Sequence, residues 1–224
     1  MFRSLHMKLV LIMLLLITSL MAIVGAFLMT SITGFFIEEF YQQMDSVFGD
    51  SNPSNAAFVG SLRSWAEEED VPKMQEMIEA KAGDLGLNSA TRTYYILDGR
   101  TGAFLAGSEG QEAFDRMQAT PNLLTARSGI AAGQDRVGDQ SDITAGYMDV
   151  AIPITAGESA YIIYIYDNRD TVSALNGQLF LIIVQALLVG LLISVLLSFL
   201  LSKTMIIPIE RLTEGAERVA SGDF

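Results

Sequence analysis

The sequence predicts an α+β membrane protein in which two transmembrane helices flank a small extracytoplasmic domain. Three observations lead to this prediction. Residues 9–29 and residues 179–201 are two long, uncharged and mainly apolar runs, and a helix of either length covers a bilayer core of about 30 Å. The segment between them changes from helical to extended hydrophobic periodicity and back. That segment also carries almost all of the acidic residues.

The first apolar run is interpreted as an uncleaved span. It follows Arg3, His6 and Lys8, and a secretory signal peptide is the alternative because Val24-Gly25-Ala26 resembles a small-residue cleavage site. The apolar part of a signal peptide is about 7 to 15 residues long, and this run is longer. We therefore expect a membrane span.

Basic residues indicate the orientation. Those on one side of the two spans are Arg3, Lys8, Lys203, Arg211 and Arg218. On the other side only Arg169 lies near a span. The positive-inside rule then places both termini in the cytoplasm and residues 38–170 outside a multi-pass protein of the plasma membrane.

Three helical stretches follow the first span. Residues 30–47 keep helical spacing, so this helix is expected to continue out of the membrane. After a turn-rich break, residues 57–65 and a segment starting at Pro72 predict two more helices. The acidic run of residues 67–70 between them is interpreted as a solvated helix end, with a cation site as the alternative.

The middle of the chain predicts an antiparallel sheet. Residues 92–97 and 103–106 are expected to form a hairpin around Asp98-Gly99, and residues 144–154 and 159–166 two further strands. Residues 111–118 and 122–127 read as short helices or turns, and residues 129–142 as a loop. Because apolar residues fill both faces of the last strand, it should lie centrally in the sheet. From Arg169 the chain becomes helical and runs into the second span.

Beyond the second span the pattern becomes amphipathic. Pro208 is acceptable in the first turn of a helix. Apolar residues then recur at three- and four-residue steps between charged ones, as in a coiled-coil seam. The residues expected to form this relay seam are Pro208, Ile209, Leu212, Glu214, Ala216 and Val219.

Small residues recur every fourth position in both spans, which would let helices approach closely in a dimer. The alternative is that small residues are simply common in spans. The residues predicted to form the transmembrane contact, including one amide able to hydrogen-bond across it, are Ala22, Ala26, Gln185, Gly190, Ser194 and Ser198.

Composition excludes several kinds of site. The chain has no cysteine and one histidine, His6, so thiolate and poly-histidine metal sites are absent. The net charge is −12, and the segment from Glu38 to Asp170 has 22 acidic and 9 basic residues, a net −13. Such a surface disfavours nucleic-acid binding. No catalytic, cofactor-binding or metal-binding residue is predicted.

Two further hypotheses concern the extracytoplasmic segment. The loop residues Asp135, Asp139 and Asp142 offer carboxylates for calcium, although their spacing is not that of an EF-hand. Several strand tyrosines offer a pocket, although strand aromatics more often form core. These tyrosines are Tyr94, Tyr95, Tyr147, Tyr161 and Tyr164.

Three features resemble known signalling families. The helix from Pro208, closing with Ala220-Ser221-Gly222-Asp223-Phe224, resembles the first helix of a HAMP relay module. The Asp98–Gly102 turn and Ile152-Pro153-Ile154 look like an extracytoplasmic PAS-like (single Cache) sensor domain. The opening residues 4–10, together with this architecture, resemble the sensor histidine kinases of the WalK/VicK cell-wall type.

The resemblance implies a domain order and a set of partners. The expected divisions are a cytoplasmic end (1–8), a first span (9–29), a PAS-like sensor domain with flanking helices (30–178), a second span (179–201) and the start of HAMP (202–224). The resemblance implies a homodimer through the transmembrane and HAMP helices, and a cytoplasmic response regulator as partner. ATP and Mg²⁺ are expected only in a kinase core beyond this segment. The alternatives are a membrane-anchored binding or scaffolding protein, or the sensor half of a chemotaxis receptor or diguanylate cyclase. The extracellular ligand is left open.

Overall fold

The computed structural model describes residues 5–49, 52–201, 203–204, 208, 212–213 and 215. The chain divides into two compact units, which are described separately. One unit comprises Met1–Ser31 with Ala174–Phe224, and the other comprises Ile32–Ser173. Helices α1 (Leu5–Phe48) and α6 (Asp170–Leu201) each contribute residues to both units.

The first unit contains the apolar parts of α1 and α6. Within Leu11–Phe48 and Val172–Leu197, stretches of mean hydropathy 2.7 and 2.9 are long and apolar enough to cross a membrane. Most of their large side chains are exposed, including Phe27 at 69% and Leu192 at 67%. Apolar side chains exposed along a helix require either lipid or other protein to cover them. The two helices are therefore candidate membrane spans.

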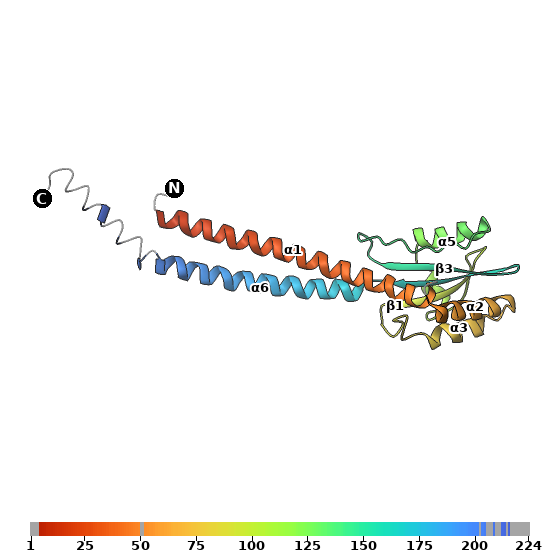
Figure 1. The fold of residues 1–224 in the computed structure, drawn as a ribbon. Helices are drawn as coiled ribbons and strands as arrows, with labels where there is room; N and C mark the ends of the chain where they lie inside the picture. Colours follow the sequence, from red (N-terminus) through yellow and green to blue (C-terminus); the bar gives the residue numbers. More distant parts are fainter. Residues whose placement is uncertain are drawn as a thin grey trace. The chain divides into compact units, whose positions relative to one another are not determined.

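The second unit is a four-stranded antiparallel sheet with helices on both faces (Figure 1). The strands are β1 (Arg92–Asp98), β2 (Phe104–Gly107), β3 (Met148–Ala156) and β4 (Ser159–Asp167), in the spatial order β2-β1-β4-β3. The predicted central position of the last strand is thus confirmed. The helices are α2 (Pro53–Glu67), α3 (Val71–Ala80), α4 (Gln111–Asp115) and α5 (Pro121–Ala131).

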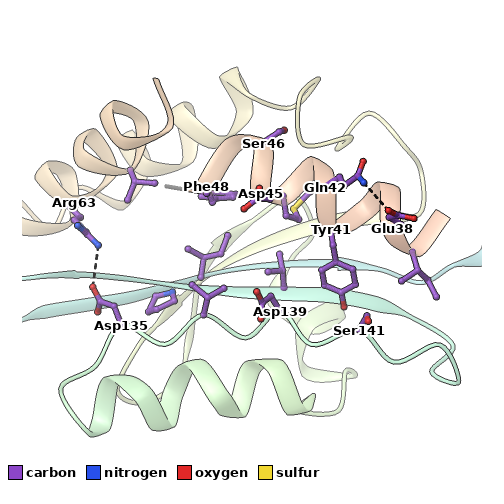
Figure 2. Close-up of a pocket in the computed structure, with 18 of the residues that line it drawn as sticks. Glu38, Tyr41, Gln42, Asp45, Ser46, Phe48, Arg63, Asp135, Asp139 and Ser141 are labelled. Carbon is purple, nitrogen blue, oxygen red and sulfur yellow. Dashed lines mark hydrogen bonds and ion pairs between the residues drawn. The ribbon is translucent and has the colours of Figure 1, made fainter. Parts of the chain in front are cut away.

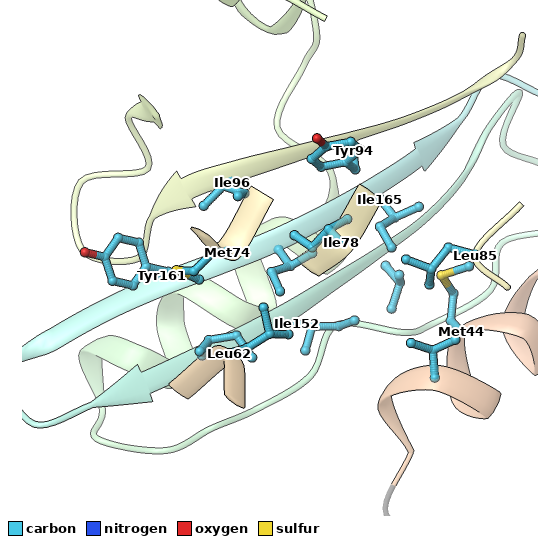
Figure 3. Close-up of a cluster of buried hydrophobic side chains, with 14 of the residues drawn as sticks. Met44, Leu62, Met74, Ile78, Leu85, Tyr94, Ile96, Ile152, Tyr161 and Ile165 are labelled. Carbon is cyan, nitrogen blue, oxygen red and sulfur yellow. The ribbon is translucent and has the colours of Figure 1, made fainter. Parts of the chain in front are cut away.

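Alternating side chains give the sheet two apolar faces. On one face Tyr94, Ile96 and Ile163 join the end of α1 with α2 and α3 in the larger core, part of which is drawn in Figure 3. On the other face Tyr95 and Tyr164 join α4 and α5 in a smaller core. Because both faces are covered, β1 and β4 are buried on both sides.

Some predicted boundaries were wrong. Helix α2 begins at Pro53 because Asn52 caps it, its side chain accepting from Ser54 N. Helix α5 continues to Ala131, into the predicted loop, and Thr120 caps its start. Strand β3 begins at Met148, four residues later than predicted. Residues 142–146 form a turn instead, in which the Asp142 carboxylate accepts hydrogen bonds from Thr144 N and Thr144 Oγ1.

The edge strand β3 is protected against pairing with another chain. Gly138 exchanges two backbone hydrogen bonds with Ala151 on its open side. Pro153, two residues further on, has no N–H to offer at that edge. A Cβ on Gly138 would collide with the Asn122 carbonyl, so only glycine permits this close approach.

A buried ion pair lies at the end of β4. Arg92 Nε is 3.0 Å from Asp167 Oδ2, with 11% and 7% of the two side chains exposed. Arg92 Nη1 also donates to Gln43 Oε1 (2.6 Å) and to Leu85 O (2.8 Å). Its guanidinium lies 4.8 Å from the Phe40 ring centroid. One side chain therefore ties α1, β1, β4 and the segment after α3 together.

The junction between β4 and α6 is two residues long, and hydrogen bonds hold both of its residues. Asn168 N donates to Thr91 O, and Arg169 N donates to Asp167 Oδ1. Arg169 has φ +57° and donates from Nη1 to Ile143 O and Ala145 O. A non-glycine residue in the left-handed region costs about 1 kcal/mol or more, and these bonds offset that cost.

We expect Arg92→Met to lower the free energy of unfolding by about 3 to 5 kcal/mol, because Asp167 would be left charged and buried without its partner. Urea unfolding of the full chain in detergent, followed by fluorescence of the single tryptophan, Trp65, measures this loss. The matched control is Lys81→Met, which removes the cation of an exposed pair with Asp84 and should change stability far less. Equal losses in the two variants would contradict the assigned role of Arg92.

Candidate functional site

The predicted relay seam lies largely beyond the residues that the structure describes. Pro208 and Leu212 have helical backbone, and Leu212 is 73% exposed. Ile209, Glu214, Ala216 and Val219 lie outside the described residues. The seam therefore stays a prediction.

Some of the residues predicted to form the transmembrane contact face the other helix of the same chain, and others are exposed. A Cβ on Gly190 would lie 3.6 Å from Ile17 Cγ2, and Ser194 is 2% exposed, so these two positions face the other helix of this unit. Ala22, Ala26 and Gln185 are exposed, and the side chain of Ser198 is outside the described set. Gly25, which lies outside the four-residue repeat of small residues, is buried against Ile183.

A groove of about 1040 Å³ lies between α1, α2, β3 and the segment 135–141 of the second unit. We call it the α1–β3 groove. Figure 2 shows α1 on one side of it and the sheet with the 135–141 segment on the other. Its apolar lining residues are Ile37, Met44, Phe48, Val59, Val137, Val150, Ile152 and Pro153.

Two polar bridges cross the groove. Arg63 Nη2 on α2 lies 3.3 Å from Asp135 Oδ2, and Thr155 Oγ1 donates to the other oxygen of Asp135 at 2.6 Å. Tyr41 on α1 donates its hydroxyl to Gln140 O (3.1 Å) and to Asp149 O (3.3 Å). These bridges fix the 135–141 segment in front of β3.

The charge of the groove is strongly negative. Its ionisable lining groups, apart from the Tyr41 hydroxyl, are Glu38, Asp45, Asp135, Asp139 and Arg63. Arg63 balances Asp135, which leaves three uncompensated carboxylates. Within the described part of the chain, neither the Asp45 nor the Asp139 carboxylate has a hydrogen bond or ion pair, and Glu38 only accepts from Gln42. The groove is therefore built to meet positive charge.

A buried carboxylate supports the groove from behind. Asp149 on β3 is 3% exposed and accepts hydrogen bonds from Thr120 Oγ1 (2.5 Å), Asn122 Nδ2 (2.9 Å) and Tyr164 OH (3.2 Å). Asn122 also donates to Gln140 O and accepts from Gln140 N, so it anchors the 135–141 segment. Burial raises the pKa of Asp149, and the hydrogen bonds from Thr120, Asn122 and Tyr164 oppose that rise.

The three loop aspartates, the acidic run of residues 67–70 and His6 do not form one common site among the described residues. Asp135 and Asp139 line the groove, whereas Asp142 Oδ1 accepts from Thr144. Across the described residues, no three acidic or histidine side chains form a group that could hold a metal ion. The acidic run ends α2, and Asp70 caps α3 by accepting from Lys73 N. His6 lies in the first turn of α1.

The strand tyrosines are core residues. Tyr94, Tyr95, Tyr161 and Tyr164 are at most 8% exposed, and neither they nor Tyr147 lines the α1–β3 groove. The tyrosine that does line it is Tyr41. Its position could have been suspected from α1, where residues 38, 41, 45 and 48 share one helical face. The partner segment across the groove is about a hundred residues away and could not be found from local spacing.

We expect ionisation of the buried Asp149 carboxyl to lower the free energy of unfolding as pH rises. A carboxyl whose pKa is raised on folding binds its proton more tightly in the folded state, so its stabilising contribution is complete below about pH 4 and is lost as pH rises through the folded pKa. The free energy of unfolding of the wild type should therefore fall relative to that of Asp149→Asn as pH increases.

Asp98 is the control, because its pKa is shifted in the opposite direction to that of Asp149. Hydrogen bonds from Thr101, joined by one from Arg100 N, lower the pKa of the Asp98 carboxyl. The wild type should therefore lose stability relative to Asp98→Asn as pH falls. Urea unfolding between pH 3.5 and 8, a range of roughly the carboxyl pKa to neutrality, measures both. Parallel pH profiles of the two differences would contradict the environment assigned to Asp149.

In comparisons with known proteins, the chain matches no family model, no curated protein and no solved structure.

Proposed function

We propose that this chain is the sensory and membrane-relay portion of a transmembrane histidine kinase resembling the WalK/VicK type. In this proposal the unit Ile32–Ser173 is an extracellular PAS-like sensor domain, and residues 202–224 begin a HAMP module. The kinase core, with its ATP and Mg²⁺, would follow this segment and would phosphorylate a cytoplasmic response regulator. The protein would act as a homodimer through its transmembrane and HAMP helices.

The junction of β4 with α6 is the observation that carries this proposal. Central strand β4 is followed after only Asn168 and Arg169 by a helix of 32 residues that contains a candidate span. The buried Arg92–Asp167 pair and the bonds of Arg169 restrain this junction. A relay needs an element in which movement at one end reaches the other. No proline interrupts α6.

A membrane-anchored binding protein without output is the second candidate. The α1–β3 groove favours it equally, since a groove serves binding whether or not a signal follows. The two candidates differ in the natural reading frame. A frame that continues past Phe224 into phospho-acceptor and ATP-binding sequences supports the kinase, and a stop codon supports the anchored protein. Continuation into chemoreceptor or diguanylate cyclase sequences would keep the relay but change the output.

The proposed topology can be tested by labelling, since the chain contains no cysteine. We expect Ser141→Cys to react with a membrane-impermeant maleimide added to intact cells, because residues 38–170 would lie outside. Thr204→Cys should react only after the cells are permeabilised, because it would follow the second span on the cytoplasmic side. Both positions are exposed in the structure. Labelling of Thr204→Cys in intact cells would overturn the topology.

The relay can be tested with a proline in α6. In the natural full-length protein, Arg92→Lys should change phosphate transfer to the response regulator by roughly two- to tenfold, since it disturbs the restrained junction. Val195→Pro removes a backbone hydrogen bond and kinks the helix, so Arg92→Lys should then have no further effect. Val195→Ala is the control and should preserve that effect.

The measurement is transfer of radiolabelled phosphate in isolated membranes, with membrane insertion verified by the maleimide labelling. A change caused by Arg92→Lys that survives in the Val195→Pro background would contradict a relay through α6.

A further inference from the structure

We propose that the α1–β3 groove binds a cationic amphipathic peptide segment, with its basic side chains on Glu38, Asp45 and Asp139 and its apolar side chains against Val59 and Val137. This assignment deepens the proposed function, on which its signalling part rests, by naming the class of ligand. Binding itself does not depend on any output.

The charges select a cation. Asp45 and Asp139 stand on opposite sides of the groove, one on α1 and one on the 135–141 segment, as Figure 2 shows. Both are exposed, and within the described residues neither carboxylate has an ion pair or hydrogen bond. A basic group in the groove would be attracted to both carboxylates and would cost little desolvation, because both groups remain near water.

The lining between the carboxylates selects an apolar component as well. Val137 is 43% exposed although it faces a cavity whose base includes Met44, Val150 and Ile152. Covering such a surface is favourable in proportion to the apolar area removed from water. A metal ion or a simple polyamine would leave this surface uncovered, whereas a peptide with alternating basic and apolar side chains covers it.

The size of the groove favours an extended segment over a small molecule. Its volume of about 1040 Å³ lies at the upper end of small-molecule pockets, which run from about 300 to 1,000 Å³. Its outer carboxylates are exposed, so the groove is open to a ligand from solvent.

A dimer that pairs this groove with itself is disfavoured. If the groove lay on the two-fold axis, the uncompensated carboxylates of both copies would face one another. The proposed homodimer, through the transmembrane and HAMP helices, leaves the groove available to a ligand.

Occupation of the groove would act directly on α1. Glu38, Tyr41 and Asp45 lie on one face of this helix and line the groove, and the same helix contains the first candidate span. Met44 and Ile37 on the adjoining face belong to the larger core. A peptide in the groove therefore contacts the helix that would carry the signal into the membrane.

The test uses the full chain in nanodiscs of zwitterionic phosphatidylcholine, which does not attract cationic peptides. The probe is a fluorescent synthetic octapeptide of alternating lysine and leucine, and its counterpart has glutamate in place of lysine. We expect saturable binding of the lysine peptide, seen by fluorescence anisotropy, and no binding of the glutamate peptide.

Matched variants locate the binding. Asp45→Asn with Asp139→Asn should weaken binding by about tenfold, because two facing charges are lost. Glu67→Gln with Asp115→Asn changes net charge equally on exposed positions outside the groove, and should weaken it less than about twofold. Val137→Ser should weaken binding roughly threefold without altering charge.

Equal weakening by the two double variants would show general charge attraction and overturn the proposal, as would the absence of saturable binding or tight binding of the glutamate peptide. These results leave the relay through α6 untouched, because phosphate transfer in the Val195→Pro background measures that relay separately. Loss of the relay would likewise leave peptide binding intact.

Discussion

The buried pair of Arg92 and Asp167 is the constraint on which the rest of the unit Ile32–Ser173 depends. Two charges taken out of water are stable only when geometry and further hydrogen bonds satisfy them. Here Gln43 Oε1 and Leu85 O accept from the guanidinium, and Arg169 N donates to the carboxylate. Each of these partners comes from a different part of the chain. Satisfying one buried cation therefore fixes α1, the end of β4 and the start of α6 together, which makes the junction a defined structure and not a loose linker.

The second organising feature is the fixed position of the 135–141 segment. Asn122 bonds both to Gln140 of this segment and to Asp149 on β3, and Gly138 pairs with the edge of β3. The segment thus protects the sheet edge and at the same time forms one wall of the α1–β3 groove. Helix α1 forms the opposite wall, where Tyr41 and Asp45 line the groove. The same helix contacts Arg92 of the ion pair through Phe40 and Gln43.

The sequence was sufficient where structure follows from local pattern. The two apolar runs, the hairpin at Asp98 and the central position of β4 follow from hydrophobic periodicity and turn chemistry, and the structure has all three. The start of α2, capped by Asn52, lies four residues before the predicted one, and α5 extends four residues past its predicted end, to Ala131. The groove could not be predicted, because Asp45 and Asp139 are brought together by folding and no periodicity links them. The ion pair was missed for the same reason, since 75 positions separate Arg92 from Asp167.

Amide hydrogen exchange measures whether the junction between β4 and α6 is held by its hydrogen bonds. The full chain in nanodiscs would be exchanged into D₂O, and peptides covering residues 164–173 would be followed by mass spectrometry. The account predicts that the amides of Asn168 and Arg169, which donate to Thr91 O and Asp167 Oδ1, exchange as slowly as those of β1 and β4. Exchange within seconds at these two amides, with the sheet still protected, would contradict the hydrogen-bonded junction at Asn168 and Arg169.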